Sequence, residues 1–200
     1  MKIIINLLLV LVIGALIYFV ADGIYEPIQF KAEKDRRVDA VVDQLKKVRT
    51  AQLAFRGITG KFAHDFDTLK EVLHNDSFEI IRVFGNPDDD EDGEEVIYET
   101  ILVSAKDSIN KLGLDLDSIK LIPFGGGKAF DVKAEVIEYQ STKVPVVEVR
   151  AAFKDFMGEY ANPVYKRYDN SYNPDDPTEP KYFLKFGDMN RPSTSGSWDN

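Results

Sequence analysis

The sequence predicts an α+β fold in which a long N-terminal helix, first transmembrane and then amphipathic, packs on a small antiparallel sheet. An uncharged apolar run covers residues 3–21, and an apolar stripe with helical spacing follows it. Short runs of β-branched and aromatic residues, separated by turn residues, fill much of the remainder. We therefore divide the chain into an anchor at 1–22, an amphipathic helix at 23–57 and a globular α+β domain at 58–200.

Composition excludes several classes of protein. The 200 residues carry 34 acids against 25 bases, which gives a formal net charge of −9. Because a protein that binds nucleic acid needs a basic surface, we expect no nucleic-acid partner. The absence of cysteine excludes disulfides, thiolate metal sites and cysteine nucleophiles. Two histidines are too few for a His-rich metal site.

The apolar run predicts a lipid-spanning helix. Ile3 to Ala21 contains one polar residue, Asn6, and no charge. A helix of this length spans roughly 28 Å, about the thickness of the hydrocarbon core. The alternative is a cleaved signal peptide, but the apolar core is long and Phe19-Val20-Ala21 is a poor cleavage site. In lipid, the Asn6 amide is able to hydrogen-bond a neighbouring helix or to reach the interface.

The amphipathic helix is predicted by apolar residues at a/d spacing, with charged residues between them. This stripe consists of Val38, Val41, Leu45, Val48 and Phe55, with Gln52 completing the series. Two interpretations stay open: the stripe packs on its own domain, or it also packs against neighbouring subunits. Pro27 lies between the apolar run and the stripe, so a kink near residues 22–30 is compatible with one long helix.

Shorter elements are predicted after the glycines at 57 and 60. Asp65 is a candidate N-cap for a helix at 66–73, and Ser104 with Asp107 forms a start signal for a helix ending near 112. Residues 160–181, rich in Tyr, Asn, Pro and Asp, read as an irregular loop that either contacts a partner or lies pinned to its own sheet. Trp198 indicates a docked C-terminus. The predicted strands are 78–84, 96–103, 119–124, 130–139, 144–153 and 182–186.

This order of elements resembles that of type IV pilins and type II secretion pseudopilins. The run from Val48 to Phe62, the segment from Asp67 to Leu73 and the tail from Ser195 to Asp199 are similar to theirs. The first of these regions and the tail also resemble a family of single-pass envelope proteins from Bacteroidota that has no assigned activity. Two further segments of this chain share that second resemblance, Pro27 to Asp35 and Ile119 to Phe124.

The resemblance implies a location in the bacterial inner membrane, with a periplasmic C-terminal domain. A strict count of bases, which begin ten residues beyond the apolar run and are interspersed with acids, favours the opposite, cytoplasmic side. Residues 1–21 lack the acidic residue of pilins, and no glycine directly precedes the apolar run. We therefore do not expect cleavage by a prepilin peptidase.

Two calcium sites are hypotheses. Residues 88–99 fit the consensus pattern of an EF-hand loop, with Asp88, Asp90, Asp92 and Glu99 as candidate ligands. The helices that flank such a loop are not predicted here, and the alternative is a solvated acidic turn. The resemblance to major pseudopilins implies a second site at Asp188 and Asp199. We expect no other cofactor.

We predict a non-enzymatic structural subunit or tether of a secretion- or motility-type envelope assembly. The sequence has no nucleophile elbow and no HExxH motif, and the glycines at 125–127 read as a turn and not as a phosphate loop. The expected partners are the bilayer, other envelope proteins and further copies of the chain. The alternative is a membrane-anchored periplasmic binding module that uses Ca²⁺. Candidate interface residues are Asn6, Val38, Val41, Leu45, Val48, Phe55 and Tyr168.

Overall fold

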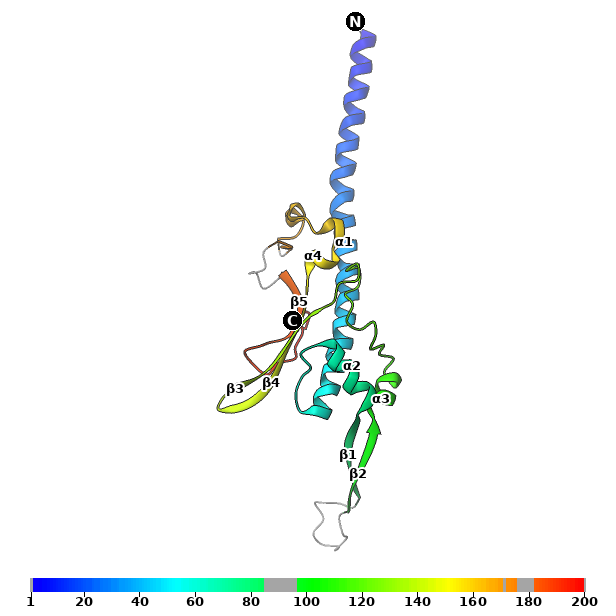
Figure 1. Ribbon diagram of the computed structural model, residues 1–200. Helices are drawn as coiled ribbons and strands as arrows, with labels where there is room; N and C mark the ends of the chain where they lie inside the picture. The colour runs from blue at the N-terminus through cyan, green and yellow to red at the C-terminus, as the bar shows by residue number, and fades with distance from the viewer. Residues whose placement is uncertain (1, 85–96, 171, 176–181, 200) are drawn as a thin grey trace, which may run out of the picture.

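The computed structural model describes residues 2–84, 97–170, 172–175 and 182–199. It confirms the α+β architecture, with a long N-terminal helix and small antiparallel sheets. Figure 1 shows the first half of this helix projecting alone, while the rest of the chain surrounds its second half.

The long helix α1 runs from Lys2 to Thr59 without interruption, and Pro27 lies inside it. The predicted anchor and the predicted amphipathic helix are therefore one element, about 87 Å long. Proline removes one backbone donor and usually bends a helix, yet α1 continues through it (Figure 1).

Two short helices begin at the predicted caps. The helix α2, Phe66–Asn75, starts at Asp65, whose carboxylate accepts hydrogen bonds from the Thr68 backbone N–H at 2.7 Å and from the Thr68 hydroxyl at 2.8 Å. The helix α3, Ala105–Lys111, starts at Ser104, whose hydroxyl accepts from the Asp107 backbone N–H at 3.3 Å. Each cap satisfies a backbone donor that the first turn leaves free.

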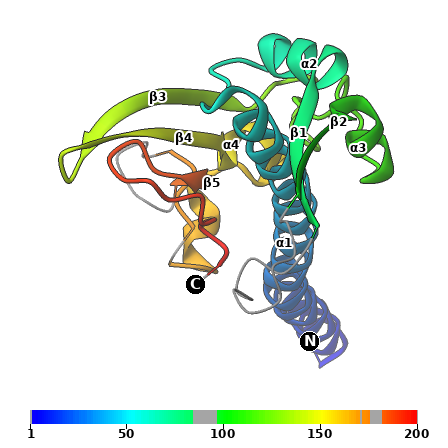
Figure 2. The same ribbon diagram turned by 90° about the horizontal axis from the view of Figure 1, so that it is seen from below.

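The strands form two separate antiparallel sheets. One is a hairpin of β1, Ser77–Phe84, and β2, Ile97–Ser104. The other has the order β3-β4-β5, with β3 Asp131–Tyr139, β4 Thr142–Ala152 and β5 Phe183–Gly187. Figures 1 and 2 place the three-stranded sheet on one side of α1, and the hairpin beside α2 and α3 at the end farthest from the N-terminus.

The prediction of a strand at 119–124 was wrong. This segment makes a single bridge, between Leu121 and Ala129, and otherwise consists of turns. Ile119 and Ile122 are buried in the core, and their spacing of three residues fits a turn that points both side chains inward. The apolar composition of the segment therefore reflects burial and not a strand.

Three short helical turns follow β4. The predicted strand ends at Phe153, whereas β4 ends at Ala152 and Phe153 begins the first helical turn. The three turns are α4, Phe153–Phe156, and the 3-10 turns η1, Gly158–Tyr160, and η2, Pro163–Arg167. The last two lie in or next to the region predicted as an irregular loop. Figure 1 shows this region beside α1, at the end of the domain nearest the projecting helix.

The core forms where α1 meets the sheets and the short helices. Val41, Leu45 and Val48 of α1 are fully buried, together with Leu69 and Leu73 of α2. Val147 and Val149 of β4 and Phe186 of β5 complete the centre of the same cluster.

The C-terminal tail is docked, as Trp198 indicated. Gly196 bridges to Phe186, and the Ser197 backbone N–H donates to the Lys185 carbonyl at 2.8 Å, so the tail lies along β5. Trp198 packs against the core, and the Arg49 guanidinium lies 5.7 Å from its ring centroid.

Candidate functional site

The projecting part of α1 is an apolar surface that nothing in the described chain covers. From Ile3 to Val20 every side chain is exposed, Asn6 included. Among the described residues, α1 is the one helix long and apolar enough to cross a membrane.

The projecting helix joins the domain through a cluster of aromatic rings centred on Phe30 of α1. Phe30 is only 1% exposed. The Tyr165 ring stacks on it with 5.0 Å between centroids, and the Tyr172 ring meets it edge-on at 5.2 Å. Tyr160 and Tyr168 complete the cluster at 5.9 and 6.1 Å. We call these five rings the aromatic junction; they hold the tyrosine-rich loop on α1. Tyr172 also packs edge-on against Phe153, the residue after β4, at 5.6 Å.

Polar contacts next to the aromatic junction fix the same loop. The Glu26 carboxylate accepts hydrogen bonds from the Tyr168 hydroxyl at 2.6 Å and from the Arg167 guanidinium at 2.7 Å. The bond to Glu26 raises the pKa of the Tyr168 phenol. About two helical turns beyond Glu26, Lys34 forms an ion pair with Asp169.

A second set of charges joins α1 to α4. The Arg37 guanidinium donates to the Phe156 carbonyl at 2.8 Å and to the Glu33 carboxylate at 2.6 Å. Arg36 also binds Glu33, and these two arginines lower the pKa of Glu33 to about 2. Glu33 thereby orients the Arg37 guanidinium toward α4.

A groove of 690 Å³ opens between α1 and the loop at this junction. Its walls combine apolar side chains with cations, and two of these cations, Lys34 and Arg167, are paired with acids. The groove therefore has no strong net charge. Its lining residues are Pro27, Ile28, Phe30, Lys31, Lys34, Asp35, Arg167, Tyr168 and Asp169.

The stripe residues of α1 lie in the protein's own core. Val41, Leu45, Val48 and Phe55 are buried, and Val38 is half-buried at the margin. Gln52 occupies a stripe position because its side-chain amide pairs with the backbone of Ala63, donating at 3.0 Å and accepting at 2.9 Å. In this arrangement the four buried side chains present no free surface to another subunit.

The EF-hand hypothesis falls mostly outside the described residues, because Asp88, Asp90 and Asp92 are among those not described. Glu99 lies in β2 opposite Arg82 of β1. Within the described ranges, no group of three or more potential ligands gathers at a metal-binding distance.

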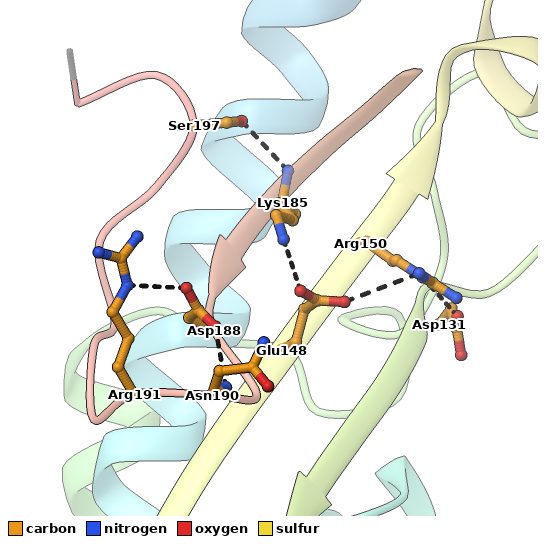
Figure 3. Close-up of polar contacts among 8 residues, drawn as sticks. All are labelled: Asp131, Glu148, Arg150, Lys185, Asp188, Asn190, Arg191 and Ser197. Atoms are coloured by element: carbon orange, nitrogen blue, oxygen red, sulfur yellow. Dashed lines mark hydrogen bonds and ion pairs between the residues drawn. The ribbon is translucent and has the colours of Figure 1, made fainter. Parts of the chain in front are cut away.

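The two C-terminal acids each have their own hydrogen-bond and ion-pair partners. Asp188 accepts a hydrogen bond from the Asn190 backbone N–H and forms an ion pair with Arg191 at 2.8 Å (Figure 3). The bond from Asn190 contributes most to the lowered pKa of Asp188. Asp199 accepts from the Gly196 backbone N–H at 2.7 Å and pairs with Arg49 at 3.0 Å. The bond from Gly196 contributes most to the lowered pKa of Asp199, and the Arg49 guanidinium adds to it.

A row of alternating charges crosses the three-stranded sheet (Figure 3). Arg150 of β4 binds Asp131 of β3 at 2.7 Å, and Lys185 of β5 binds Glu148 of β4 at 2.6 Å. Glu148 is almost buried, so Lys185 and the more distant Arg150 offset its desolvation. These four side chains form ion pairs between neighbouring strands of the sheet.

Sequence reasoning named Tyr168 and the Tyr-rich stretch that holds the other junction tyrosines, but it did not single out Phe30 or Glu26. A signal for Phe30 existed. Phe30, Val41 and Gln52 are spaced by eleven residues, about three helical turns, so they lie on one line of α1. Glu26 had no comparable signal, because its partners lie more than 140 residues away.

Comparisons of the chain with protein-family models, with curated proteins and with solved structures find no match.

Proposed function

We propose that this chain is a single-pass membrane protein whose role is association and not chemistry. The observation that carries the proposal is the uninterrupted exposure of residues 3–20 on a helix whose second half is the core of the domain. Fifteen large hydrophobic side chains are exposed on that segment. Transferring them from water into lipid is favourable by on the order of tens of kcal/mol.

The proposed anchor and the domain form one stiff unit. Because α1 enters the core without a linker, the domain is held at a set distance from the bilayer. Phe30 lies about 12 Å along the helix from Asp22, close to the headgroup layer. Tyrosine, lysine and arginine are the residues favoured at that depth, and the aromatic junction and its charged neighbours supply them.

The wider assignment is a structural subunit or tether of an envelope assembly, of the pilin or pseudopilin kind. The inner membrane would then hold residues 3–21, with the C-terminal domain in the periplasm. The support is the order of elements, a long helix followed by a short helix and small antiparallel strands, together with the resemblance at Val48–Phe62.

The anchor is tested by extracting isolated membranes with alkaline carbonate. The chain should stay in the membrane pellet. The double variant Leu9→Arg, Ile13→Arg should move to the soluble fraction. On the scale of membrane insertion, a Leu, Ile, Phe or Val contributes only about −0.3 to −0.6 kcal/mol, whereas an arginine at the centre of a span costs about 2.5–3.5 kcal/mol, so two arginines cancel most of the gain. The control, Ile80→Arg with Leu102→Arg, changes two exposed apolar residues of the hairpin and should stay membrane-bound.

Orientation is tested with single cysteines, which are clean probes because the chain has none. Asn110→Cys on α3 should react with an impermeant maleimide in spheroplasts, and Lys2→Cys should react only after lysis. The reverse pattern would place the domain in the cytoplasm.

Association is tested with a photoreactive residue at Asn6 in intact cells. Protein adducts, including a second copy of the chain, are expected. Adducts to lipid alone, together with a monomer in gentle detergent, would overturn the structural role.

A further inference from the structure

The groove beside the aromatic junction lies at the end of the domain nearest the projecting helix, where α1 leaves the domain (Figure 1). Pro27 and Ile28, the lining residues closest to the projecting segment, lie about 8–9 Å along α1 from Asp22. The headgroup layer on each side of a bilayer is about 5–8 Å thick. If residues 3–21 cross a membrane, the groove therefore opens beside the phospholipid headgroups, and this inference rests on the proposed anchor for that position.

The lining of the groove changes in chemical character along α1. Ile28 is apolar and 60% exposed. Lys31 follows about 5 Å further from the projecting segment, and Asp35 follows about 6 Å beyond Lys31. Both charged side chains are exposed. The helix thus presents an apolar residue, a cation and an anion to the groove, in order of increasing distance from the proposed span.

Lys31 and Asp35 are the charges in this groove that a ligand can use. Within the described ranges, neither side chain has an ion pair or a hydrogen bond. The other charged residues that line the groove are paired inside the protein, Lys34 with Asp169 and Arg167 with Glu26. The three cations and three anions balance, so a ligand with a net charge gains little, whereas a ligand with one charge of each sign is complementary.

Zwitterionic phospholipids carry their groups in the same order as the groove. Outward from the centre of the bilayer come the acyl chains, then the phosphate and then the ammonium group. Lys31, the unpaired charge nearer to the span, complements the phosphate, and Asp35 complements the ammonium. Arg167 adds a second cation on the membrane side of Lys31, because its partner Glu26 precedes Lys31 on α1.

We propose that the groove binds one molecule of phosphatidylethanolamine from the leaflet that faces the domain. The lipid phosphate pairs with the Lys31 ammonium, the primary ammonium of the lipid donates to the Asp35 carboxylate, and the start of an acyl chain covers Ile28. Phosphatidylcholine keeps the phosphate contact, but its quaternary ammonium has no N–H to donate. Phosphatidylglycerol brings no cation to Asp35. The site therefore prefers phosphatidylethanolamine to both.

The test uses the full chain in mild detergent, stripped of lipid, and native mass spectrometry with lipids of identical acyl chains. Phosphatidylethanolamine should bind about tenfold more tightly than phosphatidylcholine, the effect of one hydrogen bond between charged groups. Asp35→Asn should remove most of this preference and leave phosphatidylcholine binding unchanged. Lys31→Gln should weaken the binding of both lipids by a similar factor, because both carry the phosphate.

Two exposed charges of α1 outside the groove provide matched control variants. Asp39→Asn and Lys47→Gln remove the same charges as the test variants, and both should bind each lipid as the wild type does. Glycerophosphoethanolamine, the same headgroup without acyl chains, should compete only weakly, since it leaves Ile28 uncovered.

Four results would overturn the proposal. They are tighter binding of phosphatidylglycerol than of phosphatidylethanolamine, an effect of Asp39→Asn equal to that of Asp35→Asn, wild-type lipid binding by Lys31→Gln, and equal affinity for glycerophosphoethanolamine. The first would mean an anionic lipid, and the last a soluble ligand. A chain that stays in the carbonate pellet but shows no preference among the lipids would contradict this inference alone, whereas loss of the chain from the pellet would contradict the anchor.

Discussion

The Tyr168 hydroxyl donates a 2.6 Å hydrogen bond to the Glu26 carboxylate, although 142 residues separate the two in sequence. This bond lies where α1 leaves the domain, beside the buried ring of Phe30. It ties the connection between β4 and β5 to the helix that carries the apolar segment. The position of this loop on α1 therefore depends on a few long-range contacts.

Phe30 should be the main determinant of the aromatic junction. Phe30→Ala removes the ring that four tyrosines contact, and we expect the free energy of unfolding to fall by about 3–5 kcal/mol. Tyr25→Ala is the control, because Tyr25 lies on the same helix but is exposed, and its loss should change stability by less than about 0.5 kcal/mol. Urea unfolding of a soluble chain that begins at Gly23 measures both. Equal effects would mean that the junction does not stabilise the domain.

The stripe of α1 is tested with two leucines of one helix. Leu45 is fully buried, so Leu45→Ala should destabilise the protein by about 2–5 kcal/mol and lower its melting temperature by several degrees. Leu53 is 37% exposed, and Leu53→Ala should cost much less. A Leu45→Ala variant with unchanged melting but lost assembly would show that the stripe faces a partner in the working protein.

The contact between α1 and α4 should depend on pH through Glu33. Its pKa is lowered from 4.5 to about 2, chiefly by hydrogen bonds from Arg36 and Arg37. A carboxylate with a depressed folded-state pKa stabilises the protein above its unfolded pKa, and this contribution is lost as pH falls from about 4.5 towards 2. Wild type should therefore lose more stability between these pH values than Glu33→Gln does. Parallel curves, measured by unfolding at a series of pH values, would contradict the assignment, since the other carboxylates are common to both proteins.

Gly187 should be irreplaceable at the end of β5. Its φ is +83°, and a Cβ there would lie 1.9 Å from the Val147 carbonyl oxygen of the neighbouring strand. Gly113 has a φ of +66° but open space around it. Gly113→Ala should cost about 1–2 kcal/mol for the left-handed backbone alone, while Gly187→Ala adds a clash with backbone and should exceed this clearly. Similar melting temperatures for the two variants would show that β5 moves to accommodate the methyl group.

Patterns local in sequence predicted much of this fold. The Asp65 and Ser104 caps act on backbone groups three residues away, so the starts of α2 and α3 could be read directly. The stripe from Val41 to Phe55 predicted the buried face of α1, because helical periodicity alone determines which side chains share a face.

Local patterns failed where burial or distance decided the structure. The apolar run at 119–124 resembled a strand, yet Ile119 and Ile122 point into the core from turns. The tyrosine-rich loop was predicted to face a partner or its own sheet, and the packing of its rings on Phe30 of α1 was not predicted. The sequence alone could not show that the hairpin would remain uncovered, because alternating apolar residues are equally expected in a buried strand.

By itself the sequence determined the apolar helix, its amphipathic continuation, the two caps and the concentration of acidic residues between positions 77 and 104, since each depends on neighbours within a few turns of chain. The tertiary structure alone decided that Phe30 and Glu26 hold the loop around Tyr168, that the tail lies along β5, and that β1 and β2 form a ribbon separate from the other sheet. These features join segments far apart in sequence. Which segments meet is determined by how the whole chain buries its apolar surface, and no local pattern contains that information.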